Sequence, residues 1–257
     1  MGDNRRVNPD WMSHLPEELL DVSLWNLAIP GSHDSMSFCL DLSSPVVKSE
    51  SWLLKVVDRL APCWTRPCVF RWATTQQAVL SHQCDLGIRF LDLRIARKST
   101  ECIKLFFAHG IYTWITVKDC PTLRSCWSKH QQIIVSYGNQ EMVQHHPELW
   151  TEIPYWYADS TDPKKVIAYL EAQKRKGRPT GFYICGLNLT ENIQFVFRHP
   201  FQNMRKITKT ALAVLLGWVG EQRPGPEVGN INIICCDFVG VSDFCDCVIG
   251  LNYKGRC

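Results

Sequence analysis

The sequence predicts an α/β fold built from parallel βα units. Short apolar, β-rich runs recur along the chain, and amphipathic or loop-like stretches separate them. Runs that are apolar throughout are typical of strands that helices cover on both faces. The composition is globular, with 46% hydrophobic and 21% charged residues, and α/β barrels often use a length of 257 residues for one domain.

The N-terminal half alternates between expected strands and an expected helix. Residues 24–29 form an apolar run that leads into Pro30-Gly31, a pattern typical of a strand that ends in a turn. Apolar side chains recur at roughly helical spacing over residues 72–86, and the glycine that follows supplies a C-terminal stop. Residues 88–95 alternate as a strand does, and residues 103–108 form the next expected strand.

The C-terminal half continues the same alternation. Three further β-rich runs predict strands over residues 132–137, 182–186 and 231–236. Between them, Asp162-Pro163 opens a helix that extends to about residue 176, and residues 208–222 predict another. The order of these elements favours a parallel sheet over separate all-α and all-β regions.

Polar side chains fall at the ends of the expected strands. In parallel α/β folds, active-site residues collect at the carboxyl ends of the strands. The residues at those ends are His33, Asp34, Asp92, Arg94, His109 and Asp237. Two histidines, each with an available carboxylate, and an arginine at one edge of the sheet predict a shared site.

This combination of side chains suits the cleavage of a phosphodiester. One neutral imidazole can take a proton from an attacking hydroxyl while a protonated one delivers a proton to the leaving oxygen. A guanidinium matches two phosphoryl oxygens and stabilises the charge that builds in the transition state. Carboxylates such as Asp34 and Asp237 would fix the tautomer of each imidazole.

Three motifs carry a family resemblance. Residues 30–35 (PGSHDS), residues 87–94 (GIRFLDLR) and residues 108–110 (AHG) resemble the X-domain signature of phosphatidylinositol-specific phospholipase C. The chain is most similar to the stand-alone X domain-containing proteins of vertebrates, over nearly its whole length from Ser13 onward. The resemblance implies an incomplete, distorted TIM-type barrel as a single domain over residues 13–257, after an N-terminal tail of residues 1–12. It also implies that a phosphoinositide is cleaved to diacylglycerol and an inositol phosphate.

The resemblance also implies a role for each site residue. His33 resembles the general base that deprotonates the inositol 2-hydroxyl, and His109 resembles the general acid for the diacylglycerol oxygen. Asp34 would assist His109, and Asp237 would orient His33. These four residues would form the acid–base machinery.

Arg94 and Asp92 are expected to bind the substrate. Arg94 falls where the calcium-dependent relatives place an acidic calcium ligand, and a fixed cation there replaces the charge of the metal. His33-Asp34 also departs from the His-Asn pair of those enzymes. Both departures imply a calcium-independent reaction with no metal and no other cofactor.

One departure affects the barrel itself. Members of the family continue from residues 115–117 through a helix and a further strand. Here residues 118–120 pass at once to residues 121–124, which belong after that unit. The chain is therefore expected to lack one βα unit after Val117, which would expose two strand edges.

Charge and hydropathy limit the partners. The formal net charge of +3 and the lack of an aromatic–basic run argue against nucleic acid, and the longest apolar run, residues 211–220, is too short to span a bilayer. Thirteen cysteines without an export signal predict thiols in the cytoplasm. The protein is also expected to be a monomer that contacts the anionic surface of internal membranes peripherally. Residues 52–60 with Trp64 and Arg66 fit either contact with an anionic membrane or a surface helix whose apolar face packs on the core.

Two other functions remain open from the sequence. The shortened chain could bind an inositol phosphate or a phospholipid headgroup without turning it over. A ribonuclease-like phosphodiesterase would use the same acid–base logic on RNA, but the near-neutral charge argues against it. The missing βα unit is the feature that separates an enzyme from a binding module.

Overall fold

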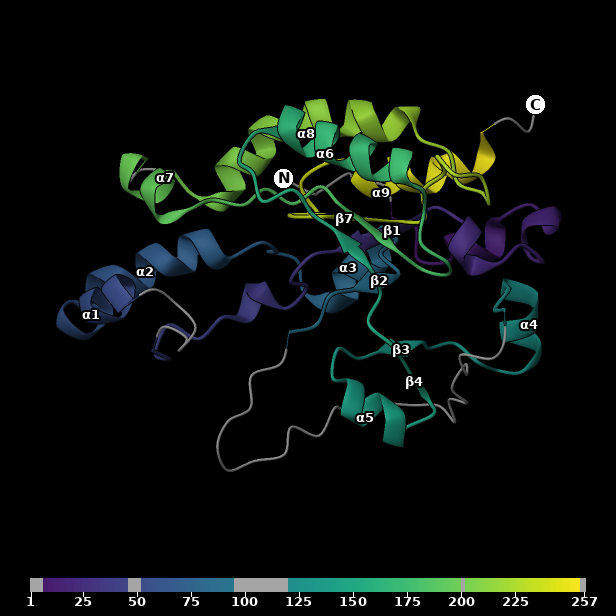
Figure 1. Cartoon of the computed structure of the whole chain (residues 1–257), viewed down its shortest axis with the longest axis horizontal. Helices are drawn as coiled ribbons and strands as arrows, with labels where there is room; N and C mark the ends of the chain where they lie inside the picture. The colour runs from purple at the N-terminus through teal and green to yellow at the C-terminus, as the bar shows by residue number, and fades with distance from the viewer. Residues whose placement is uncertain (1–6, 46–51, 95–119, 200–201, 255–257) are drawn as a thin grey trace.

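The structure is a computed structural model that describes residues 7–45, 52–94, 120–199 and 202–254. It has a mixed α/β fold around a five-stranded parallel sheet with the strand order β2-β1-β7-β6-β5 (Figure 1). The strands of this sheet are β1 (Ile29–Ser32), β2 (Phe90–Leu91), β5 (Tyr155–Trp156), β6 (Ile184–Gly186) and β7 (Ile233–Cys236). The prediction of a parallel α/β fold is confirmed.

The pairing of β1 with β7 places the first and last strands along the sequence side by side in the middle of the sheet. Ile29 lies opposite Ile233 and Ser32 opposite Cys236, so the two strands end at the same level. On its other edge β1 pairs with β2, where Ser32 lies opposite Leu91. A separate parallel pair consists of β3 (Val135–Ser136) and β4 (Leu149–Trp150).

Helices surround the sheet. Along one side of β1 and β7 lie α6 (Pro163–Lys176), α8 (Met204–Glu221) and α9 (Phe244–Gly250), which contact one another in that order (Figure 1). One end of the molecule is formed by α1 (Trp52–Leu60), α2 (Pro62–Ala73) and α7 (Ile193–Arg198). The other helices are α3 (Leu80–Leu86), α4 (Leu123–Ser128) and α5 (Gln140–His145), and 3-10 turns cover Trp11–His14, Glu17–Leu19, Leu24–Asn26, Ser37–Cys39 and Leu251–Tyr253.

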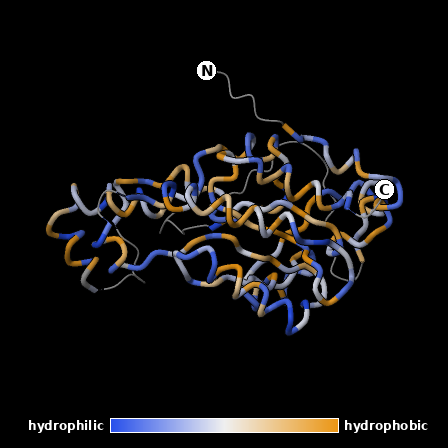
Figure 2. The backbone as a smooth tube through the Cα atoms, turned by 90° about the horizontal axis from the view of Figure 1, so that it is seen from above, coloured by the Kyte–Doolittle hydropathy of each residue, from blue (hydrophilic) through white to orange (hydrophobic). Residues whose placement is uncertain are grey.

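The core lies between the sheet and these helices. Strands β1, β6 and β7 are buried along their whole length, and the tube through the centre of the molecule is largely hydrophobic (Figure 2). Trp11, in the segment predicted as a tail, is buried in this core and donates its indole N–H to the carbonyl of Gly87 at 2.8 Å. Within the described residues, every helix is too short or too polar to cross a bilayer.

The predicted helices are found with shifted boundaries. The prediction for α6 is confirmed, and the Asp162 side chain caps it by accepting the backbone N–H of Lys164. Helix α8 begins four residues before the predicted start, because Asn203 supplies its cap. The single helix predicted over residues 72–86 is wrong: α2 ends at Ala73 and α3 begins at Leu80. The chain between them is held instead by hydrogen bonds to the ends of β1 and β7.

The strand predicted over residues 24–29 is also wrong in its bounds. Residues Leu24–Asn26 form a 3-10 turn, and β1 includes the Pro30-Gly31 pair that was expected to be a turn. Pro30 fits the strand because its carbonyl accepts the N–H of Arg89 and this position donates no hydrogen bond. Gly31 lets β2 come close, since a Cβ there would lie 2.9 Å from Phe90 Cδ1. The strand expected over residues 103–108 and the junction after Val117 lie outside the described residues.

Candidate active site

The carboxyl ends of three neighbouring strands form the candidate site. His33 directly follows β1, Asp92 directly follows β2 and Asp237 directly follows β7. Because β1 pairs with both other strands in parallel, the three side chains are placed at one edge of the sheet. Asp34 and Arg94 follow within two residues and join the same cluster.

His33 and Asp237 form the buried part of this cluster. His33 Nδ1 lies 2.7 Å from Asp237 Oδ1, and the Asp237 side chain is fully buried. A carboxylate only accepts, so Nδ1 carries the proton and Nε2 holds the lone pair. Burial lowers the pKa of His33, but the hydrogen bond and charge of Asp237 outweigh it, so the pKa is raised above its ordinary value. Burial also raises the pKa of Asp237, against the opposing effect of His33.

The second carboxylate oxygen of Asp237 is an exception to normal packing. Asp237 Oδ2 is buried and has no hydrogen-bond partner among the described residues. Buried polar atoms are nearly always satisfied, and an orphaned one inside a site is often tied to function. This atom concentrates negative charge behind the imidazole, which raises its basicity.

Arg94 bridges the exposed part of the cluster. Its guanidinium forms ion pairs with Asp34 and with Asp92, the latter at 3.1 Å from Nη2 to Oδ2. The same Nη2 lies 3.1 Å from His33 Nε2, where the lone pair of the imidazole can accept its hydrogen bond. The two aspartates thus hold a cation in front of the histidine nitrogen that faces away from Asp237.

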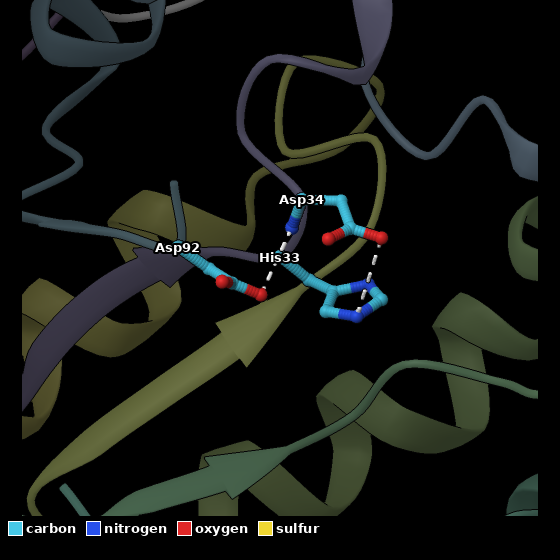
Figure 3. A group of neighbouring side chains, drawn as sticks. All are labelled: His33, Asp34 and Asp92. Atoms are coloured by element: carbon cyan, nitrogen blue, oxygen red, sulfur yellow. Dashed lines mark hydrogen bonds and ion pairs between the residues drawn. The ribbon is translucent and has the colours of Figure 1, made fainter. Parts of the chain in front are cut away.

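Asp34 occupies a constrained position beside His33 (Figure 3). Its backbone φ is 41°, a left-handed conformation that costs a non-glycine residue energy, and its N–H donates to Asp92 Oδ2 at 3.3 Å. Asp34 Oδ2 lies 3.8 Å from His33 Nε2. Burial raises the pKa of Asp34, although His33 and Arg94 oppose this effect. The carboxylate therefore lies between a histidine and an arginine that both favour its charged form.

A buried glutamine fixes the backbone of the site. The Gln76 side-chain amide donates to the carbonyls of His33 and Cys236, each at 3.0 Å, and its oxygen accepts the N–H of Val239. Gln76 is fully buried. These bonds tie the ends of β1 and β7 together, so they set the distance between His33 and Asp237. Sequence reasoning missed Gln76 because the helix predicted over residues 72–86 included it, whereas it lies between α2 and α3.

Tyr155 and Asn188 lie beside His33, and the sequence analysis did not single out either of them as a site residue. The Tyr155 ring lies edge-on to the His33 ring with 6.4 Å between the centroids, and its hydroxyl donates to Asn188 Oδ1 at 2.9 Å. Burial raises the pKa of Tyr155 well above its usual range, so the phenol stays protonated and donates. Asn188 lies two residues after β6, so the strand-end rule that selected Asp237 could have selected it too.

Gly186 makes room for Tyr155 and Asn188. A Cβ at Gly186 would lie 2.5 Å from Asn188 Oδ1 and 2.6 Å from Tyr155 Cε1. We expect Gly186→Ala to lower the free energy of unfolding by roughly 1–3 kcal/mol, because overpacking a buried strand forces its neighbours apart. Thermal unfolding monitored by circular dichroism checks this result. Gly217→Ala, on α8 with open space around its Cβ, is the control, and equal destabilisation of both variants would contradict the prediction.

The same cluster offers oxygen and nitrogen ligands to a cation. One ligand atom from each of His33, Asp34 and Asp92 lies within 4.8 Å of the others. Such a donor set suits a divalent ion, yet the Arg94 guanidinium forms ion pairs with both carboxylates and approaches the histidine nitrogen. A divalent cation there would have to displace Arg94 or share the space with its positive charge.

The structure therefore brings together five of the six residues that the sequence singled out. His33, Asp34, Asp92, Arg94 and Asp237 form one connected cluster. His109 lies in the segment 95–119, outside the described residues, so its place beside His33 stays a prediction. The catalytic roles of all six residues stay predictions as well. His14, His130, His145, His146 and His199 lie outside this cluster.

Comparison with known proteins finds relatives along nearly the whole chain. The chain is 41% identical to PI-PLC X domain-containing protein 1 from Danio rerio, over 95% of this chain and 96% of that protein. It is 38% identical to the Homo sapiens protein of the same name, over 97% and 94% of the two chains. PI-PLC X domain-containing protein 3 from Danio rerio is 31% identical over 95% and 93%. No protein-family model and no solved structure matches the chain.

The lengths of these alignments carry further information. The first runs over 298 residues and the second over 303, although this chain has 257. The relatives therefore contain residues that have no counterpart here. Identities of 31–41% over nearly the full length of both partners show common descent, and the chain belongs to the family of PI-PLC X domain-containing proteins.

Proposed function

We propose that this protein is a phosphodiesterase that cleaves a phosphoinositide to diacylglycerol and an inositol phosphate. The observation that carries the proposal is the hydrogen-bonded chain from the buried Asp237 through His33 to Arg94. It aligns an oriented base with a guanidinium that can bind a phosphoryl group. Membership of the PI-PLC X domain-containing family supports the choice of substrate.

The first step would be proton transfer to His33. The inositol 2-hydroxyl gives its proton to Nε2, and its oxygen forms a bond to phosphorus. The Asp237 carboxylate stabilises the imidazolium that results, as the aspartate of a catalytic triad does. Arg94 leaves its contact with Nε2 and binds the phosphoryl oxygens, where it offsets the charge of the transition state.

The second half of the reaction requires an acid. The phosphorus–oxygen bond to diacylglycerol breaks, and the leaving oxygen takes a proton from His109, which Asp34 would assist. Water then opens the cyclic inositol phosphate, with the two histidines in exchanged roles. Asp92 would hold Arg94 and contact the inositol ring at the same edge of the sheet.

We further propose that the sheet is part of an incomplete TIM-type barrel. The order β2-β1-β7-β6-β5 supports this fold, because the first and last strands of a closed βα barrel are also neighbours. The β3–β4 pair is separate from this sheet in the described part of the chain.

The proposed reaction needs no divalent cation, and Arg94 provides the test. Activity on phosphatidylinositol vesicles should be the same with and without EDTA, because the guanidinium supplies the positive charge. Arg94→Asp should lower the rate by about 10²-fold and create a weak calcium dependence, since a further carboxylate joins Asp34 and Asp92 beside His33. Arg198→Asp, on α7, is the control for the charge change. Parental activity that EGTA removes and calcium restores would refute the metal-free mechanism.

We also propose that the helical hairpin α1–α2 contacts an anionic membrane. Three of its residues have the highest exposed fractions of all large hydrophobic residues in the described chain: 74% for Trp52, 79% for Leu60 and 84% for Trp64. By contrast, the acidic Asp58 of α1 is only 6% exposed, and its carboxylate forms an ion pair with Arg66 of α2 at 3.0 Å. A surface helix of a protein in water has the opposite arrangement, so this face suits the interface of a bilayer.

Charge and position agree with a membrane contact. The hairpin carries the exposed basic residues Lys55, Arg59 and Arg71, which favour anionic headgroups. Helix α2 leads directly to Thr75, whose hydroxyl donates to the carbonyl of His33 and whose carbonyl accepts the N–H of Phe238. The hairpin is thus joined through α2 to the edge of the sheet that holds the site.

Replacement of the three apolar side chains tests the membrane contact. Trp52→Ser, Leu60→Ser and Trp64→Ser together should weaken binding to vesicles that contain phosphatidylinositol by about tenfold or more, because each removes apolar area from the interface. Cosedimentation with vesicles measures this effect. Trp127→Ser, an exposed tryptophan on α4, is the matched control. Unchanged cosedimentation of the triple variant would contradict the proposal.

The alternative function is a binding module for an inositol phosphate or a phospholipid headgroup. It uses the same Arg94 cluster but requires no turnover. The two functions separate in one assay, because an enzyme releases inositol phosphate from vesicles in EDTA while a binding module retains the headgroup. Release that depends on His33 supports the enzyme, and binding without release supports the module.

A further inference from the structure

A cavity with basic side chains lies between α3, α8 and the segment that follows Asp237. Its volume is about 380 Å³, within the range of small-molecule sites, and none of the five clustered site residues lines it. Three basic side chains face it: His82 from α3, and Arg205 and Lys209 from α8. Among the described residues that line the cavity, none is acidic.

The two cations of α8 that line this cavity repel each other, and no acidic side chain of the described residues lines it with them. Arg205 and Lys209 are one helical turn apart, where like charges repel each other. Neither has an ion-pair partner among the described residues. Lys206 adds a third cation in the first turns of α8, which contain no acidic residue. Arg205 and Lys209 are exposed to solvent, and an anion in the cavity would pair with both and complement the positive end of the helix dipole.

We propose that this cavity is a binding site for a small phosphate-bearing anion, separate from the site around His33. Arginine, lysine and histidine together suit a phosphate group, since all three donate hydrogen bonds to its oxygens. The cavity volume suits one headgroup or one soluble phosphate ester rather than a polymer. The same chemistry occurs in a free inositol phosphate and in a phosphoinositide headgroup.

The walls of the cavity connect it to the candidate active site. Phe238 and Gly240 belong to the segment that follows Asp237. Gln77 follows Gln76, whose side-chain amide donates to the carbonyls of His33 and Cys236. Phe238 has a backbone φ of 49°, a left-handed conformation that costs energy and must be held by its surroundings. A ligand in the cavity would stabilise this segment and with it the position of Asp237.

Titration calorimetry with inositol trisphosphate tests the proposal. Arg205→Ala with Lys209→Ala should weaken binding by about tenfold for each cation removed. Lys164→Ala with Lys165→Ala is the matched control, because it removes two exposed cations from the first turn of α6. Arg94→Ala should leave this binding event in place, which distinguishes the cavity from the active site.

Two further measurements complete the test. Inositol trisphosphate should slow amide hydrogen exchange in residues 238–241 of the parental chain and not of the cavity variant. Flotation with phosphatidylcholine vesicles that carry phosphatidylinositol bisphosphate shows whether a lipid headgroup is also accepted. Thermal unfolding verifies that the double variant Arg205→Ala with Lys209→Ala is folded. If it is not folded, the single variant Lys209→Gln is used in its place.

The outcomes are distinct from those for the proposed enzyme activity. In the Arg94→Ala background, which weakens binding at the candidate active site, binding that survives the cavity substitutions would overturn the proposal. Equal loss of binding in the α6 control, or complete loss in Arg94→Ala alone, would overturn it as well. None of these measurements requires hydrolysis, so a chain that never cleaves lipid can still bind an anion here. Conversely, an active enzyme without a second binding event would leave the proposed function intact and remove this site.

Discussion

His33→Ala should abolish phosphoinositide cleavage and leave the fold intact. A general base contributes about 10²–10⁴-fold to the rate, and the substitution also removes the group through which Asp237 acts. The imidazole lies at the end of β1 outside the apolar core, but it is the partner of the fully buried Asp237 carboxylate, so its removal should lower the thermal unfolding midpoint without unfolding the chain. Release of inositol phosphate from vesicles measures the rate.

The pH dependence gives this prediction a second readout. The base must be neutral, so the rate should fall as the pH falls through the pKa of His33, which lies above its ordinary value. In Asp237→Asn the carboxylate charge is lost, the pKa of His33 falls, and this limb of the profile should move to lower pH. The rate should also drop by about 10²–10⁴-fold, since the amide no longer enforces the tautomer.

A control histidine completes the comparison. His145→Ala, on the exposed helix α5, should keep the parental rate and the parental pH profile. If His33→Ala retained near-parental turnover, His33 would not be the base. If Asp237→Asn lost activity without moving the acidic limb, Asp237 would act on folding rather than on the imidazole.

The strand-end rule explains why much of this site could be predicted. His33 and Asp237 are separated by 204 positions. Asp237 directly follows an apolar run that predicts a buried strand, and His33 comes four positions after the end of another. Parallel pairing then requires the two to meet at one edge. Prediction worked because this inference needs only the existence and the direction of the strands, and not their exact bounds.

The failures have equally specific causes. The segment 24–29 is apolar because it is buried, but Asn232 donates to the carbonyls of Leu24 and Leu27 and holds it as a turn. Gln76 was missed because it was assigned to a helix over residues 72–86, whereas its buried amide bonds to the carbonyls of His33 and Cys236 at the ends of the paired strands β1 and β7. Such tertiary hydrogen bonds leave no periodic pattern in a sequence.

Insertion, after Val117, of the βα unit that the sequence analysis predicts to be missing should raise both stability and activity. Relatives align over 298–303 residues with this chain of 257, so they contain segments that it lacks. In the described part of the structure, the sheet ends at β2 on one side and at β5 on the other, while β3 and β4 pair separately. A strand edge without a partner leaves N–H and C=O groups unpaired, which lowers stability and promotes association with another chain.

The effect on activity follows from geometry. In a barrel, the strand number, tilt and stagger depend on one another, so the loss of one strand shifts the ends of the others. Asp92 and Arg94 follow β2, which pairs with β1 over only two residues, so this part of the site depends most on a neighbour beyond β2. A displacement of about 1 Å can lower a rate by roughly 10²-fold.

The experiment compares two chains that differ only in this unit. The longer chain carries, after Val117, the corresponding residues of the Danio rerio protein that is 41% identical. We expect a higher thermal unfolding midpoint, less oligomer by size-exclusion chromatography and a faster release of inositol phosphate from vesicles. A linker of the same length, rich in glycine and serine, is the control, because it lengthens the chain without supplying a strand. If both chains unfold at the same temperature and turn over substrate at the same rate, then β1, β2 and β7 hold His33, Arg94 and Asp237 in place without that unit.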